Sequence, residues 1–217
     1  MISKQKIIFL GIYTIIYIVI SPIVYLITGH GLHLMLIWNI ILACIPLIIM
    51  IWIQSKWVKK IWLIGVLLFF WLLFYPNSMY LISDLIYIDR SAFILTGGMY
   101  DPLIYLQNLE AYVSMFHILL GAILGIMLAV ESIRPVVTYI QEKKNQIWAF
   151  GSIIVISFAS SFAIYIGRFF RYNSWDILSV FRIVQDFFAS FSLFTVVFIF
   201  GFAILQTLLI SVLLSKK

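Results

Sequence analysis

Residues 7–28 of the chain read IIFLGIYTIIYIVISPIVYLIT, an apolar run without a single charged side chain. A helix needs roughly 20 mostly apolar residues to cross the hydrocarbon layer of a bilayer. This run is long enough for one crossing, and it is too long for the apolar core of a secretory signal peptide. It also ends without a small-residue cleavage site, so we expect it to remain attached as a first membrane span.

Five further apolar runs follow, at residues 34–53, 61 to about 75, 111–130, 147–167 and 190–214. The composition agrees with membrane insertion, because 65% of the residues are apolar, 10% are charged and the mean hydropathy is +1.15, whereas soluble domains keep about a quarter of their residues charged. Continuous apolar runs favour helices over barrel strands, which alternate apolar and polar side chains. The sequence therefore predicts an all-α, polytopic transmembrane bundle of six spans, forming a single domain over residues 1–217.

Basic residues orient this bundle, because short loops rich in lysine and arginine remain in the cytoplasm. Six spans place ten basic residues on one side and four on the other. The first group comprises Lys4, Lys6, Lys56, Lys59, Lys60, Arg134, Lys143, Lys144, Lys216 and Lys217, and the second comprises Arg90, Arg168, Arg171 and Arg182. We therefore expect both termini to be cytoplasmic in a cell membrane. The net charge of +6 then indicates orientation and affinity for anionic lipids, and it does not indicate nucleic-acid binding.

Motifs for metals and cofactors are missing from the sequence. Cys44 is the single cysteine, which excludes an internal disulfide and a cysteine-based metal cluster. No paired-histidine spacing and no phosphate-binding glycine loop is present. We predict no metal and no cofactor, and the sequence leaves open whether the protein is an enzyme.

The first polar motif, YPNSMYLISDLIY at residues 75–87, follows a third span that is too short unless its helix continues. Pro76 lacks an N–H group and is expected to kink or break the helix there. If the helix resumes, Asn77, Tyr80, Asp84 and Tyr87 share one face. Asp84 then lies in an apolar stretch, where a carboxylate needs a partner or a proton. The alternative is a structural kink whose side chains satisfy the freed carbonyl groups.

The fourth span carries a stripe of Glu110, Ser114, His117, Gly121 and Gly125, spaced four, three, four and four residues apart. The two glycines allow close helix packing, so the stripe should face the interior of the bundle. His117, with Glu110, is then a candidate intramembrane proton or hydrogen-bond site. A hydrogen-bonded structural histidine is the alternative.

The third motif, GRFFRYNSWD at residues 167–176, leaves the outer end of the fifth span. Ala159, Ala163 and Gly167 form a small-residue face that should pack against other helices. Arg171 continues this face by one turn and is expected to point inward, whereas Arg168 is rotated by about 100 degrees. Arginine forks suit carboxylates and phosphates, and interfacial anchoring is the alternative.

The first and third motifs, at residues 75–87 and 167–176, resemble the membrane-protein family called domain of unknown function 1361. The resemblance covers most of the chain, from the third span to the sixth. The family patterns are typically Pro-Asn-x-x-Tyr-x-x-Thr-Asp-Leu and Gly-Arg-Phe-x-Arg-x-Asn-Ser-Trp-Asp. Ser83 stands where threonine is usual, which keeps the hydroxyl. The resemblance implies a bacterial polytopic membrane protein and brings no activity with it.

Three functions remain open. The first is an outward-facing site for an anionic lipid head group or a lipid-linked phosphate, made by Asn77, Tyr80, Asp84, Asp101, Arg168, Arg171, Asn173 and Asp176. The second is a non-enzymatic partner or assembly subunit of another membrane protein, in which the same residues join helix ends. A small-solute transporter is third, because few polar residues, such as Asn39, His117 and Gln206, lie deep in the spans. We also expect an ion pair between Asp84 and an arginine of the third motif, with Arg171 as the first choice.

Overall fold

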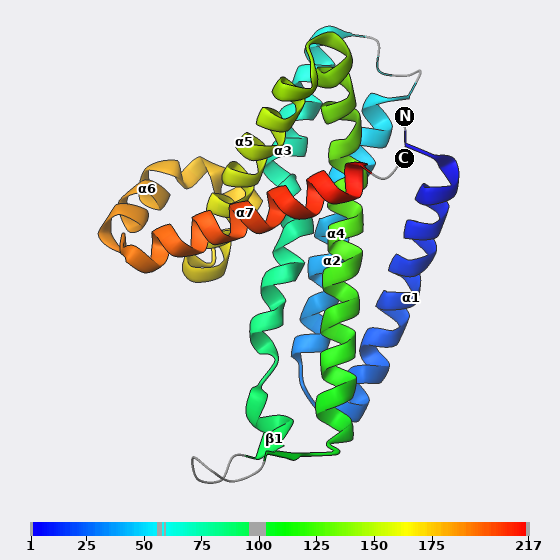
Figure 1. The fold of residues 1–217 in the computed structure, drawn as a ribbon, viewed down its shortest axis with the longest axis vertical. Helices are drawn as coiled ribbons and strands as arrows, with labels where there is room; N and C mark the ends of the chain where they lie inside the picture. The colour runs from blue at the N-terminus through cyan, green and yellow to red at the C-terminus, as the bar shows by residue number, and fades with distance from the viewer. Residues whose placement is uncertain (1, 56–57, 59, 96–102, 216–217) are drawn as a thin grey trace.

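The computed structural model describes residues 2–55, 58, 60–95 and 103–215, and almost all of its regular structure is helical (Figure 1). Six of the helices in these residues are long and apolar enough to cross a membrane. The α-helices are α1 (Lys4–Thr28), α2 (Leu32–Ile53), α3 (Ile61–Ser83), α4 (Leu109–Lys143), α5 (Gln146–Tyr165), α6 (Val180–Ala189) and α7 (Leu193–Ser215). The predicted all-α bundle of six spans is confirmed.

Shorter elements join the spans. The 3-10 helices η1 (Asp84–Tyr87) and η2 (Arg90–Ala92) follow α3, and the strands β1 (Ile94–Leu95) and β2 (Ile104–Tyr105) pair antiparallel before α4. The π-helix η3 (Ile166–Phe170) extends α5, and the 3-10 helix η4 (Ser174–Ser179) leads into α6. These elements place the polar motifs of residues 75–87 and 167–176 at helix ends.

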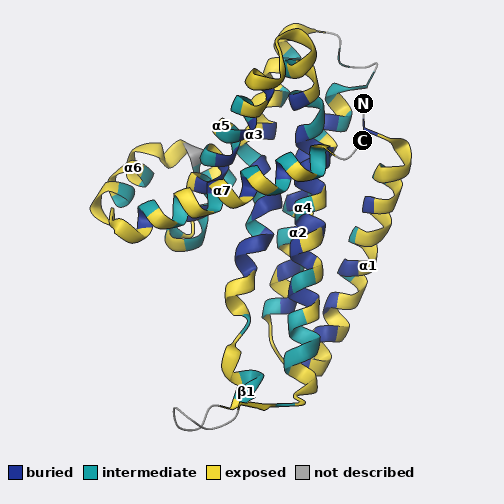
Figure 2. Cartoon of the chain, in the orientation of Figure 1, coloured by how far each residue is buried: buried dark blue, intermediate teal, exposed yellow. Residues whose placement is uncertain are grey.

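The core lies where α2, α3 and α4 pack together, and buried residues follow their facing sides (Figure 2). On α2 the buried positions recur every three or four residues, as one face of a helix requires: His33, Leu36, Ile40, Ala43, Leu47 and Met50. Large side chains on α1, α6 and α7 are more exposed, which suits helices that meet lipid. α6 lies to the side of the bundle (Figure 1).

Glycine allows α4 to approach its neighbours closely. A Cβ atom on Gly125 would lie 2.5 Å from the carbonyl oxygen of Ser78, and one on Gly121 would lie 2.6 Å from the hydroxyl of Tyr17. Both glycines and His117 are buried. The inward orientation predicted for this part of the α4 stripe is therefore confirmed, but Glu110, at the N-terminal end of the stripe, is exposed.

Three expectations about helix ends need correction. The break expected at Pro76 is not found, since α3 continues through this residue to Ser83, and the kink that was its alternative is not confirmed. The fourth span does not end near residue 130, because α4 has 35 residues and reaches Lys143. Residues 180–189, expected to lie in a loop, form the amphipathic helix α6, in which Ile183, Asp186 and Phe187 are the less exposed positions.

Candidate functional site

An ion pair joins the C-terminal end of α3 to the C-terminal end of α5. Arg168 Nη2 lies 2.6 Å from Asp84 Oδ1, and the two side chains are only 9% and 1% exposed. Asn39 Nδ2 of α2 donates to the other carboxylate oxygen of Asp84 at 3.3 Å. Three helices therefore meet at one carboxylate, and its charge is balanced within the protein.

The same arginine makes further contacts with α3 and η1. Its Nε donates to the hydroxyl of Ser83 at 3.1 Å and its Nη2 donates there as well, while Nη1 donates to the hydroxyl of Tyr87 at 3.1 Å. The guanidinium carbon also lies 4.2 Å from the centre of the Tyr80 ring, a cation–π distance. Every nitrogen of Arg168 is thus engaged, Nη1 and Nη2 by Tyr87 and Asp84 of the face that the first motif predicted, and Nε by Ser83, which was not assigned to that face.

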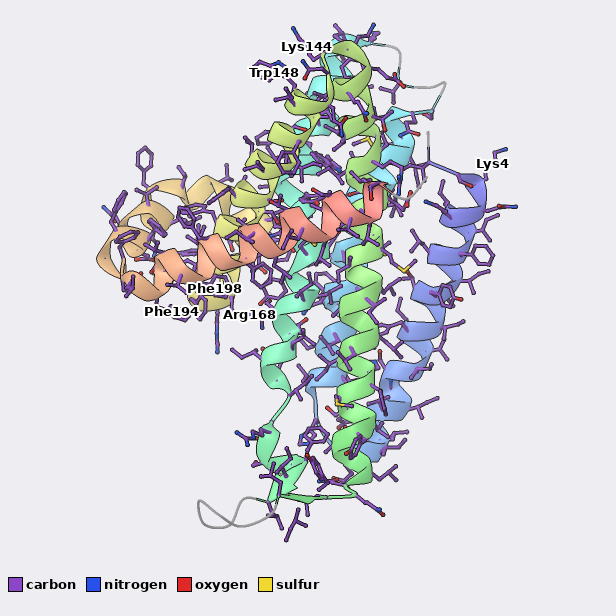
Figure 3. All side chains as sticks on the ribbon, in the orientation of Figure 1. Lys4, Lys144, Trp148, Arg168, Phe194 and Phe198 are labelled. Atoms are coloured by element: carbon purple, nitrogen blue, oxygen red, sulfur yellow. The ribbon has the colours of Figure 1, made fainter. Side chains whose placement is uncertain are left out.

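The expected ion pair between Asp84 and an arginine of the third motif is confirmed, but the first choice, Arg171, is wrong, because the partner is Arg168. The α-helix gives way to π-helix at Ile166–Phe170, which adds residues to the turn. Extrapolation from Ala163 and Gly167 at 3.6 residues per turn therefore fails, and Arg168 takes the inward position. Arg171 ends the helix with a left-handed backbone, φ 60°, and its side chain is exposed. The label in Figure 3 marks Arg168 beside α3.

The small-residue face of α5 also differs from its prediction. Ala159 is exposed and Ala163 is half-buried, so this face is not packed against helices along its whole length. A Cβ on Gly167 would make only ordinary contacts, 3.4 Å from the Tyr172 carbonyl oxygen and 3.6 Å from the Tyr80 ring. The small residues leave space beside α3 instead.

Polar side chains compensate the backbone around Pro76. Asn77 Nδ2 donates to the carbonyl oxygen of Phe74 and to Ser174 Oγ, both at 3.0 Å. Ser174 Oγ donates to the carbonyl oxygen of Leu73 at 3.1 Å. The proline lacks an N–H and so offers no helical donor to the carbonyl of Leu72, four residues earlier; these bonds add donors at the neighbouring carbonyls of Leu73 and Phe74. They also attach the third motif to the first.

The remaining predicted residues of the third motif shape the loop before α6. Asp176 accepts the backbone N–H of Asn173 at 2.7 Å, a contact that caps the start of η4. The Tyr172 hydroxyl donates to Asp186 on α6 at 2.7 Å, and this hydrogen bond, followed by burial, raises the pKa of Tyr172. Asp101 lies outside the described residues.

A groove of about 390 Å³ lies beside the ion pair. Apolar and aromatic residues form most of its walls, and amides and hydroxyls add polar groups. The lining residues include Trp38, Asn39 and Leu42 of α2, Leu73, Asn77 and Tyr80 of α3, Ala163 and Gly167 near the end of α5, Tyr172, Asn173 and Ser174 of the following segment, and Ile183 of α6. Of the predicted site residues, Asn77, Tyr80 and Asn173 line this groove. Asp84, Arg168, Arg171 and Asp176 do not.

His117 belongs to a separate cluster in the core. Its Nε2 lies 2.9 Å from Ser21 Oγ, its Nδ1 lies 3.1 Å from His33 Nδ1, and Tyr17 stacks on its ring at 4.4 Å. Ser21 donates its proton to the Tyr17 carbonyl, so it accepts from His117, which in turn accepts from His33. This assignment gives a neutral hydrogen-bonded chain across α1, α2 and α4.

Glu110 does not join that cluster, since it is exposed in the first turn of α4, about two turns away. Sequence reasoning missed Tyr17, Ser21 and His33. His33 lay one residue before the predicted second span, and histidines on two spans were the signal that could have paired them. Within the described part of the chain, no three His, Cys, Asp or Glu side chains gather closely enough to hold a metal ion.

Six apolar spans, polar clusters at their ends and a groove between them define a multi-pass α-helical integral membrane protein. The chain belongs to the family described as "Protein of unknown function (DUF1361)", whose match covers residues 38–209. This match includes the motifs of residues 75–87 and 167–176 and runs from most of α2 to most of α7. No curated protein and no solved structure matches the chain.

Proposed function

We propose that this protein binds a membrane lipid, or a lipid-linked molecule with a phosphate, in the groove between α2, α3 and α5. The observation that carries the proposal is the lining of the groove, where apolar walls adjoin the polar groups Asn77, Tyr80 and Asn173. Ligand sites commonly combine predominantly apolar walls with a few placed polar groups. A lipid has an apolar chain that suits the apolar walls and a polar head group that suits the amides and hydroxyls.

The rim of the groove favours entry from the bilayer. Trp38 of α2 is 54% exposed and Phe162 of α5 is 39% exposed, and both belong to spans. Exposed faces of spans meet lipid, so a molecule could enter sideways without crossing water. The amide and hydroxyl groups would then bind its polar part, and the apolar walls would hold the start of an acyl chain.

The charge for an anionic group would come from Arg171. Arg168 is already balanced by Asp84, which argues against the expected direct contact between Arg168 and a phosphate. Arg171 is exposed next to Tyr172, which lines the groove, and no ion pair among the described residues includes it. We therefore assign the anionic contact to Arg171.

A scaffold function is the second candidate, and the contacts of Arg168 favour it. Hydrogen bonds to Ser83, Asp84 and Tyr87 use each of its nitrogens, as expected of a residue that joins helix ends. A non-enzymatic partner of another membrane protein requires only that its helix ends be held together in this way.

We further propose a bacterial cell membrane as the location, with both termini cytoplasmic, from the family resemblance and the distribution of basic residues.

Blocking the groove tests the proposal. Ala163 lines the groove, and Ala159, one turn earlier on α5, is exposed and does not line it. Ala163→Phe should fill the space, whereas Ala159→Phe makes the same change outside it. Mass spectrometry of copurifying lipids should show a species that wild type and Ala159→Phe retain and Ala163→Phe loses. Identical lipid profiles in all three proteins would refute lipid binding here and leave the scaffold function.

Arg171→Gln tests the anionic contact. One basic side chain near a membrane surface contributes about 1 kcal/mol, so retention of an anionic species should fall roughly fivefold. Unchanged retention would remove Arg171 from the site without affecting the groove itself.

A further inference from the structure

A second groove lies at the opposite ends of the spans, independent of the one described above. Its volume is about 490 Å³, and it lies between α1, α4 and the end of α7. In Figure 1 the end of α7 reaches α4, and the start of α1 lies on the other side of α4, apart from it. Apolar side chains form most of the walls, and three charged residues complete the lining: Phe9, Leu10, Tyr13, Met127, Val130 and Leu213, with Lys6, Glu131 and Arg134.

The three charged residues form one cluster. Lys6 Nζ lies 2.8 Å from Glu131 Oε1, and Arg134 holds the same carboxylate through Nη2 at 2.9 Å and Nε at 3.0 Å. The Glu131 side chain is 9% exposed, whereas those of Arg134 and Lys6 are 21% and 50% exposed. Glu131 is thus a buried acceptor that fixes two more accessible cations beside the groove.

This cluster retains one positive charge. Glu131 neutralises one of the two cations, and its hydrogen bonds use one N–H of Lys6 and two of Arg134. Lysine carries three donors and arginine five, so both side chains have further N–H groups for an anion. Charge-assisted hydrogen bonds to phosphate use such groups.

The depth of the cluster matches that of lipid head groups. Lys6 lies 22 residues before Thr28, the last residue of α1, and Glu131 lies 22 residues after Leu109, the first residue of α4. At 1.5 Å per residue both are roughly 33 Å from the far ends of their helices. The hydrocarbon layer is about 30 Å thick, so the charges lie at its edge and the apolar walls lie within it.

We propose that this groove binds an anionic glycerophospholipid. Lys6 and Arg134 bind the head-group phosphate, Glu131 holds the two cations in place, and an acyl chain lies along Phe9, Tyr13 and Met127. The bound lipid would fill the space between α1 and α7 beside α4. Basic pockets between spans are a known means of binding anionic lipid head groups.

A charge series in the purified full chain tests this site. Lys6→Gln brings the net charge of the cluster from +1 to zero, and Glu131→Gln brings it to +2. Lys4, two residues away on α1 and also exposed, provides the matched control, because Lys4→Gln changes the charge of the protein equally. Native mass spectrometry in detergent would measure retention of added phosphatidylglycerol against phosphatidylcholine.

We expect Lys6→Gln to reduce phosphatidylglycerol retention about fivefold, Lys4→Gln to leave it unchanged and Glu131→Gln to maintain or increase it. Met127→Trp, which fills the groove without changing charge, should reduce retention even if Glu131→Gln unfolds. Equal losses for Lys4→Gln and Lys6→Gln would overturn the site, as would full retention by Met127→Trp. Thermal stabilisation by inorganic phosphate equal to that by phosphatidylglycerol would also contradict a lipid site.

Discussion

Arg168 Nη2 contacts Asp84 Oδ1 at 2.6 Å and thereby joins residues 84 positions apart in the chain. The ion pair is almost fully enclosed, and both partners make further hydrogen bonds that satisfy the carboxylate and the guanidinium. Such a pair holds its two helices in one arrangement, because separating it would leave a charge buried without a partner. It therefore fixes the end of α5, which forms one wall of the groove between α2, α3 and α5.

Breaking this ion pair should destabilise the protein strongly. Asp84→Asn and Arg168→Gln each leave one partner uncompensated, and we expect each to lower the free energy of unfolding by on the order of 3–5 kcal/mol. The double variant Asp84→Leu/Arg168→Met should regain most of this loss, because it leaves no buried charge. Thermal unfolding in detergent would compare the stability of the three variants with that of the wild type.

Arg171→Gln is the matched control for that series. Arg171 is exposed, and its substitution should change the free energy of unfolding by no more than about 0.5 kcal/mol. Greater destabilisation by Arg171→Gln than by Arg168→Gln would show that the structural assignment of the two arginines is reversed.

The membrane fold could be predicted because apolar length alone determines a span. Runs such as residues 7–28 correspond closely to helices, and α1 covers Lys4–Thr28. The ends were harder, because Arg134 and Lys143 read as loop residues although α4 continues through them. α6 was missed because its ten residues are too few for a span, and only its helical periodicity could have revealed it.

The candidate site was predictable in part, because spacing within one helix can be read from the sequence whereas a π-helical turn and the packing between helices cannot. The face of Tyr80, Asp84 and Tyr87 follows from helical spacing, and all three contact Arg168. The choice between Arg168 and Arg171 depends on a π-helical turn at Ile166–Phe170, and no propensity rule indicates this turn. The contact of Asn39 with Asp84 depends on how α2 packs against α3, which the spacing within one helix does not contain.

Close packing of α4 against α3 predicts different outcomes for two glycine substitutions. Gly125→Ala would place its Cβ 2.5 Å from a backbone oxygen of Ser78, whereas Gly151→Ala meets nothing within 4 Å. Gly125→Ala should cost about 1–3 kcal/mol through overpacking, and Gly151→Ala should be neutral or slightly stabilising. Parallel thermal unfolding curves would compare them, and equal stability would contradict the close approach of α4 to α3.

The bond between Tyr172 and Asp186 predicts a pH dependence outside the spans. The hydrogen bond to Asp186 raises the pKa of Tyr172 above its ordinary value, which is about 10. Its contribution to stability is therefore complete below pH 10 or so and disappears as the pH rises through the folded-state pKa. Asp186→Asn should lower the Tyr172 pKa toward the ordinary value, as tyrosine-selective NMR titration would show. An unchanged pKa would contradict this contact.

Orientation can be tested with single cysteines in a Cys44→Ser background. Lys144 and Ser91 are exposed at opposite ends of the spans, and Figure 3 shows Lys144 at the end of the molecule where α4 meets α5. The distribution of basic residues predicts that Lys144→Cys reacts with an impermeant thiol reagent only after the membrane is opened. Ser91→Cys should react in intact cells. The reverse labelling pattern would show that the predicted orientation is wrong.

Lipid binding in the groove between α2, α3 and α5 is the central functional claim, and a structure of the full chain in lipid nanodiscs tests it most directly. We predict density for a lipid between Trp38, Asn77 and Tyr80, with its polar end near Asn173, in nanodiscs made from the native lipid extract. The Ala163→Phe protein should lack this density under the same conditions. A well-resolved wild-type groove that is closed by its own side chains, or that contains ordered water alone, would contradict lipid binding.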